Sequence, residues 1–219
     1  MQAAADTRRE CWKCRAERGA ALVCPRCAAI QPLSADADLF TVLDLPRQLA
    51  LDLADLERRY HAASRAVHPD RFQTASRCER ELSLAASAAV NRAYRTLRDP
   101  VARGRYWLEL HGARLGDGSP QVPPAIAAEV FETQEKLEEL RAAARPDLRR
   151  EVEALRDGFT GRLGALRDEL CALYASANGG APSLDELKRR LSEIAYLRTL
   201  LGDIEDATGE GLRGTDHRH

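Results

Sequence analysis

The stretch from residue 53 to residue 72, LADLERRYHAASRAVHPDRF, decides the fold of the central part of the chain. Apolar residues recur in it at steps of three and four, which is the spacing of one face of an α-helix. Pro69 disfavours helical geometry at the residue before it, so we predict that this helix ends at His68. The predicted apolar face consists of Leu53, Leu56, Tyr60, Ala63 and Val67.

Two further helices are predicted after the loop that contains Pro69. The first carries an apolar stripe and is expected to pack on the preceding helix as an antiparallel pair. Asp99 followed by Pro100 is typical of a helix N-terminus and predicts a shorter helix that reaches about His111. The apolar stripe of the first consists of Leu82, Ala86, Ala89, Ala93 and Leu97.

Beyond a Gly- and Pro-rich break at residues 116–124, apolar residues recur in heptads as far as residue 207. The turn at Arg145-Pro146 and the capping pair of Ser183 and Glu186 divide this region into three long helical patterns. Short connections between long helices imply antiparallel neighbours, so we predict a three-helix bundle.

Composition supports the same fold class. Aromatic residues make up 5% of the 219 residues, while the helix formers Ala, Leu and Arg recur throughout, so we expect an all-α protein. The net charge of −1 provides no general basic field, and therefore neither nucleic acid nor an anionic membrane is expected as the main partner. No apolar run approaches the roughly 18 to 20 residues that a membrane span needs.

The N-terminal residues mix basic and acidic side chains and contain no apolar segment of the kind found in secretory signals. A mitochondrial transit signal is poorly supported as well, and the Ala- and Arg-rich composition is typical of a bacterial protein, so we expect the bacterial cytoplasm, with the mitochondrial matrix as the alternative. In such a reducing compartment, clustered cysteines favour metal binding over disulfides.

Four of the six cysteines form two C-x2-C pairs separated by nine residues. Each pair can present two sulfurs to one ion, and two pairs complete a tetrahedral site. Because four thiolates leave no position for water or substrate, we expect a structural ion, zinc, with iron left open as the alternative. The predicted ligands are Cys11, Cys14, Cys24 and Cys27, whereas Cys78 and Cys171 are predicted to be free thiols.

Small metal-binding knuckles can also bind RNA, and this segment contains aromatic and basic residues. Glu10 and Glu17 interrupt that patch, so RNA binding is kept as an alternative only. The residues that would carry it are Trp12, Lys13, Arg15, Arg18 and Arg26.

The tripeptide His68-Pro69-Asp70 lies between two antiparallel helices, of which the first has a basic face opposite its apolar stripe. Over about residues 36–111 this arrangement resembles the J-domain of the DnaJ superfamily. The sequence VNRAYRTLRDP at residues 90–100 is similar to the end of the HscB-type J-domain. The tetracysteine segment before it and the bundle after it also resemble that family's layout.

The resemblance implies a co-chaperone of iron–sulfur cluster assembly that binds an IscU-type scaffold protein, delivers it to a DnaK/HscA-class heat-shock chaperone and stimulates that chaperone's ATP hydrolysis. No nucleophile or acid–base set accompanies the tripeptide, so we expect no enzyme activity of its own. Pro69 stiffens the loop, and an arginine of the partner can hold the Asp70 carboxylate bidentately. The predicted chaperone-binding residues are His68, Pro69, Asp70, Arg58, Arg59, Arg65 and Arg71.

A client-binding patch is predicted on the first helix of the bundle. Phe131 lies one residue, or about 100° of helix, off the heptad seam, so its ring is expected to be exposed. Ala127 and Ala128 stand where the family usually has the larger Leu and Met. Glu193 stands where the family tends to have an aromatic residue, so the last helix is left out of the predicted patch. The alternative is a wider apolar face that packs on the J-domain. The predicted patch consists of Ala127, Ala128, Phe131, Glu132 and Glu135.

Two other functions stay open at this point: a J-domain co-chaperone for a different client, and a metal-knuckle RNA-binding protein. We expect a monomer or a weak homodimer. The predicted parts are a tetracysteine domain at residues 8–32, a J-domain at 34–114, a linker at 115–123, a three-helix bundle at 124–207 and a disordered tail at 208–219.

Overall fold

The computed structural model describes residues 10–17, 19, 21–34, 37–115, 124–143, 145–176 and 182–209. These residues contain seven α-helices, one short 3-10 helix and no strand, which confirms the predicted all-α fold. The chain divides into two compact units, Met1–Arg103 and Gly104–His219. Residues 116–123 of the predicted linker, residues 210–219 of the predicted tail and the N-terminal residues 1–9 lie outside the described residues.

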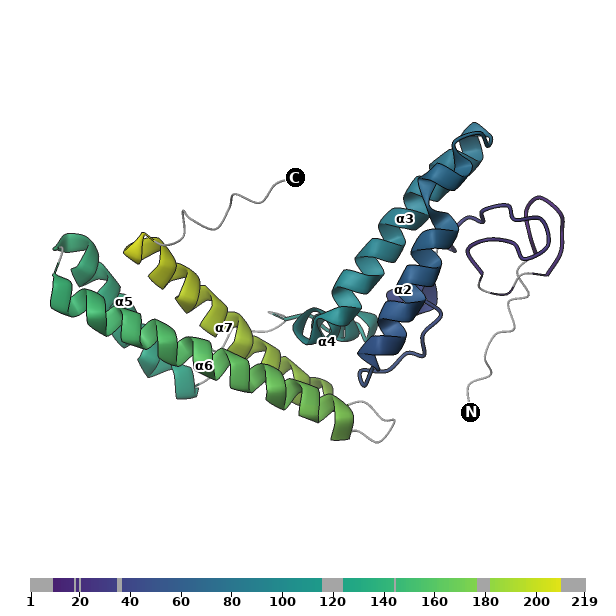
Figure 1. Cartoon of the computed structure of the whole chain (residues 1–219). Helices are drawn as coiled ribbons and strands as arrows, with labels where there is room; N and C mark the ends of the chain where they lie inside the picture. The colour runs from purple at the N-terminus through teal and green to yellow at the C-terminus, as the bar shows by residue number, and fades with distance from the viewer. Residues whose placement is uncertain are drawn as a thin grey trace. The chain divides into compact units, whose positions relative to one another are not determined.

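The first unit contains the antiparallel pair of α2 (Leu53–Val67) and α3 (Arg77–Arg98), which Figure 1 shows side by side, as predicted. The short helix α1 (Leu39–Val42) packs on α3, and the 3-10 helix η1 (Pro69–Phe72) forms the loop after α2. The core of this unit includes the fully or nearly fully buried Phe40, Leu43, Leu49, Leu56, Val67, Val90, Ala93 and Leu97.

Side chains at the helix starts fix where α2 and α3 begin. Asp52 caps α2 as its Oδ1 accepts a hydrogen bond from the backbone N–H of Ala54 at 2.9 Å. A capping box opens α3: the Ser76 hydroxyl accepts from the N–H of Glu79, and the Glu79 carboxylate accepts from the N–H of Ser76. Leu53, which the periodicity assigned to the apolar face, is 51% exposed because it is the first residue of its helix.

In the second unit, α5 (Pro124–Ala142), α6 (Pro146–Ser176) and α7 (Leu184–Thr208) pack on one another as a three-helix bundle. Ser183 caps α7 through the N–H of Glu186, as predicted from the sequence. The buried seam includes Ile126, Leu137, Val152, Phe159, Leu166, Leu170, Leu187, Leu191, Ile194, Leu197 and Ile204.

Helix α4 (Pro100–Leu110) contains the division between the two units. Gly104 of this helix lies so close to the bundle that a Cβ there would collide with the hydroxyl of Tyr174 on α6 and press on Leu187 and Leu191 of α7. The glycine therefore permits the close approach of α4 to these two helices.

Polar side chains tie the three bundle helices together. The guanidinium of Arg162 on α6 donates to Glu129 of α5 at 2.7 Å and to Glu193 of α7 at 2.8 Å. Glu193 stands where the family that the sequence resembles tends to have an aromatic residue. In this structure it joins an ion pair within the bundle. No helix among the described residues is long and apolar enough to cross a membrane.

Candidate functional site

The four clustered cysteines meet at one point. Their sulfur atoms all lie within 4.8 Å of one another, with Cys11 and Cys24 buried and Cys14 and Cys27 partly buried. The sulfurs of Cys11 and Cys27 are 3.6 Å apart, and those of Cys14 and Cys24 are 3.7 Å apart. These four residues could hold a metal ion, as the spacing predicted.

Two tight turns present the sulfurs. In the first, the N–H of Arg15 donates to the carbonyl of Cys11 at 2.9 Å, and in the second the N–H of Ala28 donates to the carbonyl of Cys24 at 3.0 Å. Each turn places the residue after its second cysteine in the left-handed region, with φ of 62° at Arg15 and 56° at Ala28. Both residues have a Cβ, so this backbone is strained and depends on the surrounding contacts to hold it.

Gln31 is a supporting residue that the sequence did not point to. It is 1% exposed, and its side-chain amide donates to the sulfur of Cys11 at 3.2 Å and to the carbonyl of Ala29 at 2.8 Å. Its amide oxygen accepts from the N–H of Trp12 at 3.2 Å. Gln31 therefore orients a sulfur and links the two turns, as groups behind metal ligands commonly do.

Electrostatics also favour a cation among the sulfurs, because thiolates at this separation repel one another. Burial raises the pKa of the Cys11 thiol, but the N–H groups of Cys14 and Lys13 donate to its sulfur and lower the pKa to about 6. The N–H of Ala29 lowers the pKa of Cys27, but burial and the neighbouring thiols outweigh it and raise the pKa to about 12. A metal ion would let all four ionise, so the donor set fits one.

An ion pair attaches this segment to the helical pair. The ammonium of Lys13 lies 3.0 Å from a carboxylate oxygen of Glu79, whose side chain is 10% exposed. Donation from Lys13, and then from Ser76, holds the pKa of Glu79 below its usual value. The metal-binding turn is therefore linked to the capping box that begins α3.

Two of the residues predicted to carry the alternative of RNA binding, Trp12 and Lys13, make contacts within the chain. Lys13 is paired as described, and the indole N–H of Trp12 donates to the carbonyl of Ile30 at 2.7 Å. Arg15 and Arg26 are exposed, whereas Arg18 lies outside the described residues.

The loop with His68-Pro69-Asp70 is exposed and braced. The imidazole Nδ1 of His68 accepts from the N–H of Asp70 at 3.3 Å, and the amide of Gln73 donates to the Asp70 carboxylate at 3.3 Å. The His68 and Asp70 side chains are 54% and 72% exposed. Phe72 is 7% exposed, so its buried ring fixes the loop to the core.

Two serines of α3 hold the other end of this loop. The hydroxyls of Ser83 and Ser87 donate to the carbonyl of Val67, the last residue of α2, at 2.7 and 3.1 Å. A helix-end carbonyl that would otherwise lack a partner is thereby satisfied. The guanidinium of Arg71 donates to the carbonyl of Arg65 at 3.3 Å, which closes the loop back onto α2.

The predicted basic residues do not form one cluster. Arg65 and Arg71 lie beside the loop, and Arg58 lies about two helical turns before Arg65 on the same face. Arg58 pairs with Asp55. Donation from Arg58, and then from Arg59, lowers the pKa of the Asp55 carboxyl.

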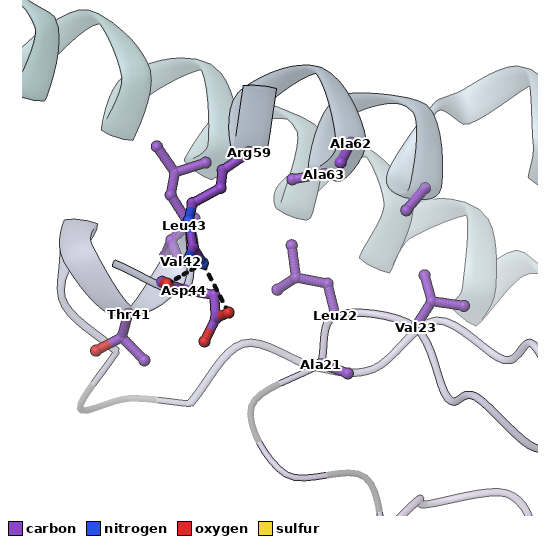
Figure 2. A pocket seen from close by; sticks show the side chains of 11 residues that line it. Ala21, Leu22, Val23, Thr41, Val42, Leu43, Asp44, Arg59, Ala62 and Ala63 are labelled. Carbon is purple, nitrogen blue, oxygen red and sulfur yellow. Dashed lines mark hydrogen bonds and ion pairs between the residues drawn. The ribbon is translucent and has the colours of Figure 1, made fainter. Parts of the chain in front are cut away.

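Arg59 points toward the turn that follows α1, where its guanidinium pairs with Asp44 at 2.8 Å (Figure 2). It also pairs with Asp55 at 2.9 Å. Arg59 borders a cavity of about 430 Å³ between α2 and the cysteine segment, into which Leu22 and Val23 point. The structure thus gives Arg59 an internal contact that the sequence did not predict.

The predicted client patch lies on the outer face of α5. All five of its residues are exposed, and the ring of Phe131 is 64% exposed, as its offset from the heptad seam predicted. Among the described residues, no ion pair engages Glu132 or Glu135, so both carboxylates are available to a partner. The patch combines an exposed aromatic ring with two carboxylates that have no ion-pair partner in the described part of the chain.

No protein-family model matches the chain. Among curated proteins, human iron–sulfur cluster co-chaperone protein HscB is 35% identical over 156 residues, which cover 68% of this chain and 66% of the human protein. The co-chaperone protein HscB homolog of Bordetella pertussis is 39% identical over 135 residues, 60% of this chain and 79% of the relative. The chain belongs to the HscB co-chaperone family.

The fold agrees with this membership. The crystal structure of human HscB superposes with a TM-score of 0.68 at 28% identity, covering 90% of this chain and 97% of that one. The HscB family works in iron–sulfur cluster assembly, and the tetracysteine cluster at residues 11–27 fits the family's metal domain.

Proposed function

We propose that this HscB-family chain binds an IscU-type scaffold protein, delivers it to a DnaK/HscA-class heat-shock chaperone and stimulates the chaperone's ATP hydrolysis. The observation that carries the proposal is the exposed His68-Pro69-Asp70 loop, braced on both sides by α2 and α3. The relatives support it, because the human one is named as an iron–sulfur cluster co-chaperone. In this proposal the chain acts on the chaperone's catalysis and performs none itself.

The loop would contact the chaperone mainly through charge. The Asp70 carboxylate can accept two hydrogen bonds from an arginine of the partner, and Pro69 with the His68 contact limits the loop to few conformations. Arg58, Arg65 and Arg71 would face an acidic partner surface and speed the encounter. Arg59, already paired with two carboxylates, would add less charge and would mainly hold α2 against α1.

The client would bind α5. Phe131 supplies an apolar anchor, Ala127 and Ala128 let a partner approach closely, and Glu132 and Glu135 offer charges for basic groups on the scaffold. A J-domain co-chaperone for another client would share the loop but would not bind the scaffold.

We assign zinc to the four cysteines, because a closed four-thiolate set suits a structural ion; iron is the alternative. The ion would neutralise the thiolates and hold the two turns together. The bacterial relatives support a place in the bacterial cytoplasm, with the mitochondrial matrix as the alternative.

The test is single-turnover ATP hydrolysis by the purified chaperone, with scaffold protein, in the presence of wild type or Asp70→Asn. We expect Asp70→Asn to lose stimulation while it keeps its fold and its scaffold affinity, since the side chain is 72% exposed. Asp168→Asn, the same change at an exposed site on α6, is the matched control and should stimulate like wild type. Equal stimulation of ATP hydrolysis by Asp70→Asn and wild type would refute the proposed J-domain function.

A further inference from the structure

A groove of about 340 Å³ runs between α5 and α6, beside the predicted client patch. Its floor is apolar, formed by Phe159, which is 6% exposed, and by Leu155. Glu132, a member of the client patch, stands at its edge. The full lining is Glu129, Glu132, Thr133, Lys136, Ala154, Leu155, Gly158, Phe159 and Arg162.

Gly158 keeps the groove open. It lies inside α6, where glycine disfavours the helix by about 1 kcal/mol relative to alanine. A Cβ added there would meet nothing within 4 Å, and its φ is not in the left-handed region, so neither packing nor backbone geometry requires a glycine. What the missing side chain leaves is space.

The charges around the groove are paired with one exception. Lys136 is 2.6 Å from Glu151, and Arg162 is held by Glu129 and Glu193. No ion pair among the described residues engages Glu132. The groove therefore has an apolar floor, two neutralised cations and, at its edge, one carboxylate without an ion-pair partner in the part of the chain that the structure describes.

We propose that this groove is a second anchor site for the client, and that it takes a lysine or arginine side chain of the scaffold protein. The aliphatic stem would lie over Phe159 and Leu155 and the cation would meet Glu132. A purely apolar side chain fits less well, because it would cover the Glu132 carboxylate without giving it a partner. The inference rests on the proposed function, since the occupant belongs to the client.

The groove continues the α5 patch. Glu132 belongs to both, and the preceding residue is the exposed Phe131. A client that covers Phe131 would therefore also lie over the edge of the groove. A basic side chain of that client could then enter the groove between α5 and α6.

The decisive variant is Gly158→Leu, which fills the groove without removing any contact. Its matched control is Gly164→Leu, at an exposed glycine of the same helix that also has open space around its Cβ but does not line the groove. Both changes improve helix propensity, so both variants should melt at or above the wild-type temperature. Scaffold binding is measured by calorimetry on the full chain.

We expect Gly158→Leu to raise the scaffold Kd about tenfold or more and Gly164→Leu to leave it within about twofold. Glu132→Lys, a surface change that does not threaten the fold, should also weaken binding and should remove most of its salt dependence. Wild-type affinity in Gly158→Leu, or equal weakening by both leucines, would overturn the groove proposal while leaving the proposed function in place. If wild type binds no scaffold, both fail together.

Discussion

Replacing Phe131 with alanine should weaken scaffold binding strongly and leave the fold unchanged. The ring is 64% exposed in the free chain. A phenylalanine side chain buries about 150 to 250 Å² when fully covered, so about 100 to 160 Å² remains for a partner. At about 25 cal/mol per Å², covering that surface stabilises a complex by at most about 2.5 to 4 kcal/mol.

Part of this stabilisation is lost to ordering of side chains at the interface, and alanine keeps part of the contact. We therefore expect Phe131→Ala to cost about 1.5 to 3 kcal/mol of binding free energy, which is about 10- to 150-fold in Kd. The melting temperature should stay the same or rise slightly, because alanine is the better helix former at an exposed position.

Isothermal titration calorimetry with the purified scaffold protein measures this change. Leu84→Ala is the matched control: Leu84 is 60% exposed on α3, so the substitution removes a comparable exposed apolar side chain outside the α5 patch. We expect its Kd to stay within about twofold of wild type. An unchanged Kd for Phe131→Ala would refute the assignment of the client to α5, and equal losses in both variants would show nonspecific apolar contact instead.

Three further predictions concern the metal centre and the stability of the bundle. Gln31→Leu should lower metal affinity about 10- to 100-fold in a chelator competition, because a sulfur loses its N–H donor; unchanged affinity would count against a supporting role. Gly104→Ala should destabilise by about 1 to 3 kcal/mol in chemical denaturation, whereas Gly161→Ala, with open space around its Cβ, should stabilise by about 0.5 to 1 kcal/mol. Donation from Arg145, and then a backbone N–H, lowers the pKa of Asp147 from 3.8 to about 2, so its stabilising effect is complete above about pH 4 and is lost as the pH falls toward 2. Arg145→Met should move that pKa upward in an NMR titration, and the stability difference from wild type should shrink over the same interval; an unmoved titration would exclude the ion pair as the cause.

Much of the fold followed from local patterns. Asp99 and Ser183 are recognisable as caps from the sequence because a cap acts on N–H groups within three residues of itself. The exposure of Phe131 followed from its angular position on a helix, which sequence spacing alone determines. The capping box at residues 76–79 has a readable S-x-x-E spacing and could have been predicted in the same way.

The surroundings of the site were less predictable. The sequence groups Arg59 with the other basic residues, but its partner Asp44 lies 15 residues away in the turn after α1, and no periodic pattern predicts such a pair. Gln31 is 20 residues from the sulfur to which it donates. The link between Lys13 and Glu79 spans 66 positions, and only the folded chain brings these two residues together.

The sequence by itself determined the helices and the loop tripeptide and indicated the four clustered cysteines, because each depends on residue spacing within a short segment of chain. Only the tertiary structure decided which charges are already paired and which remain free. It also showed that the two glycines have different surroundings: Gly158 lines an open groove, whereas Gly104 permits a close contact between helices. Identical residues differ here because the space around a side chain is set by elements that are distant in sequence, and local propensity carries no information about them.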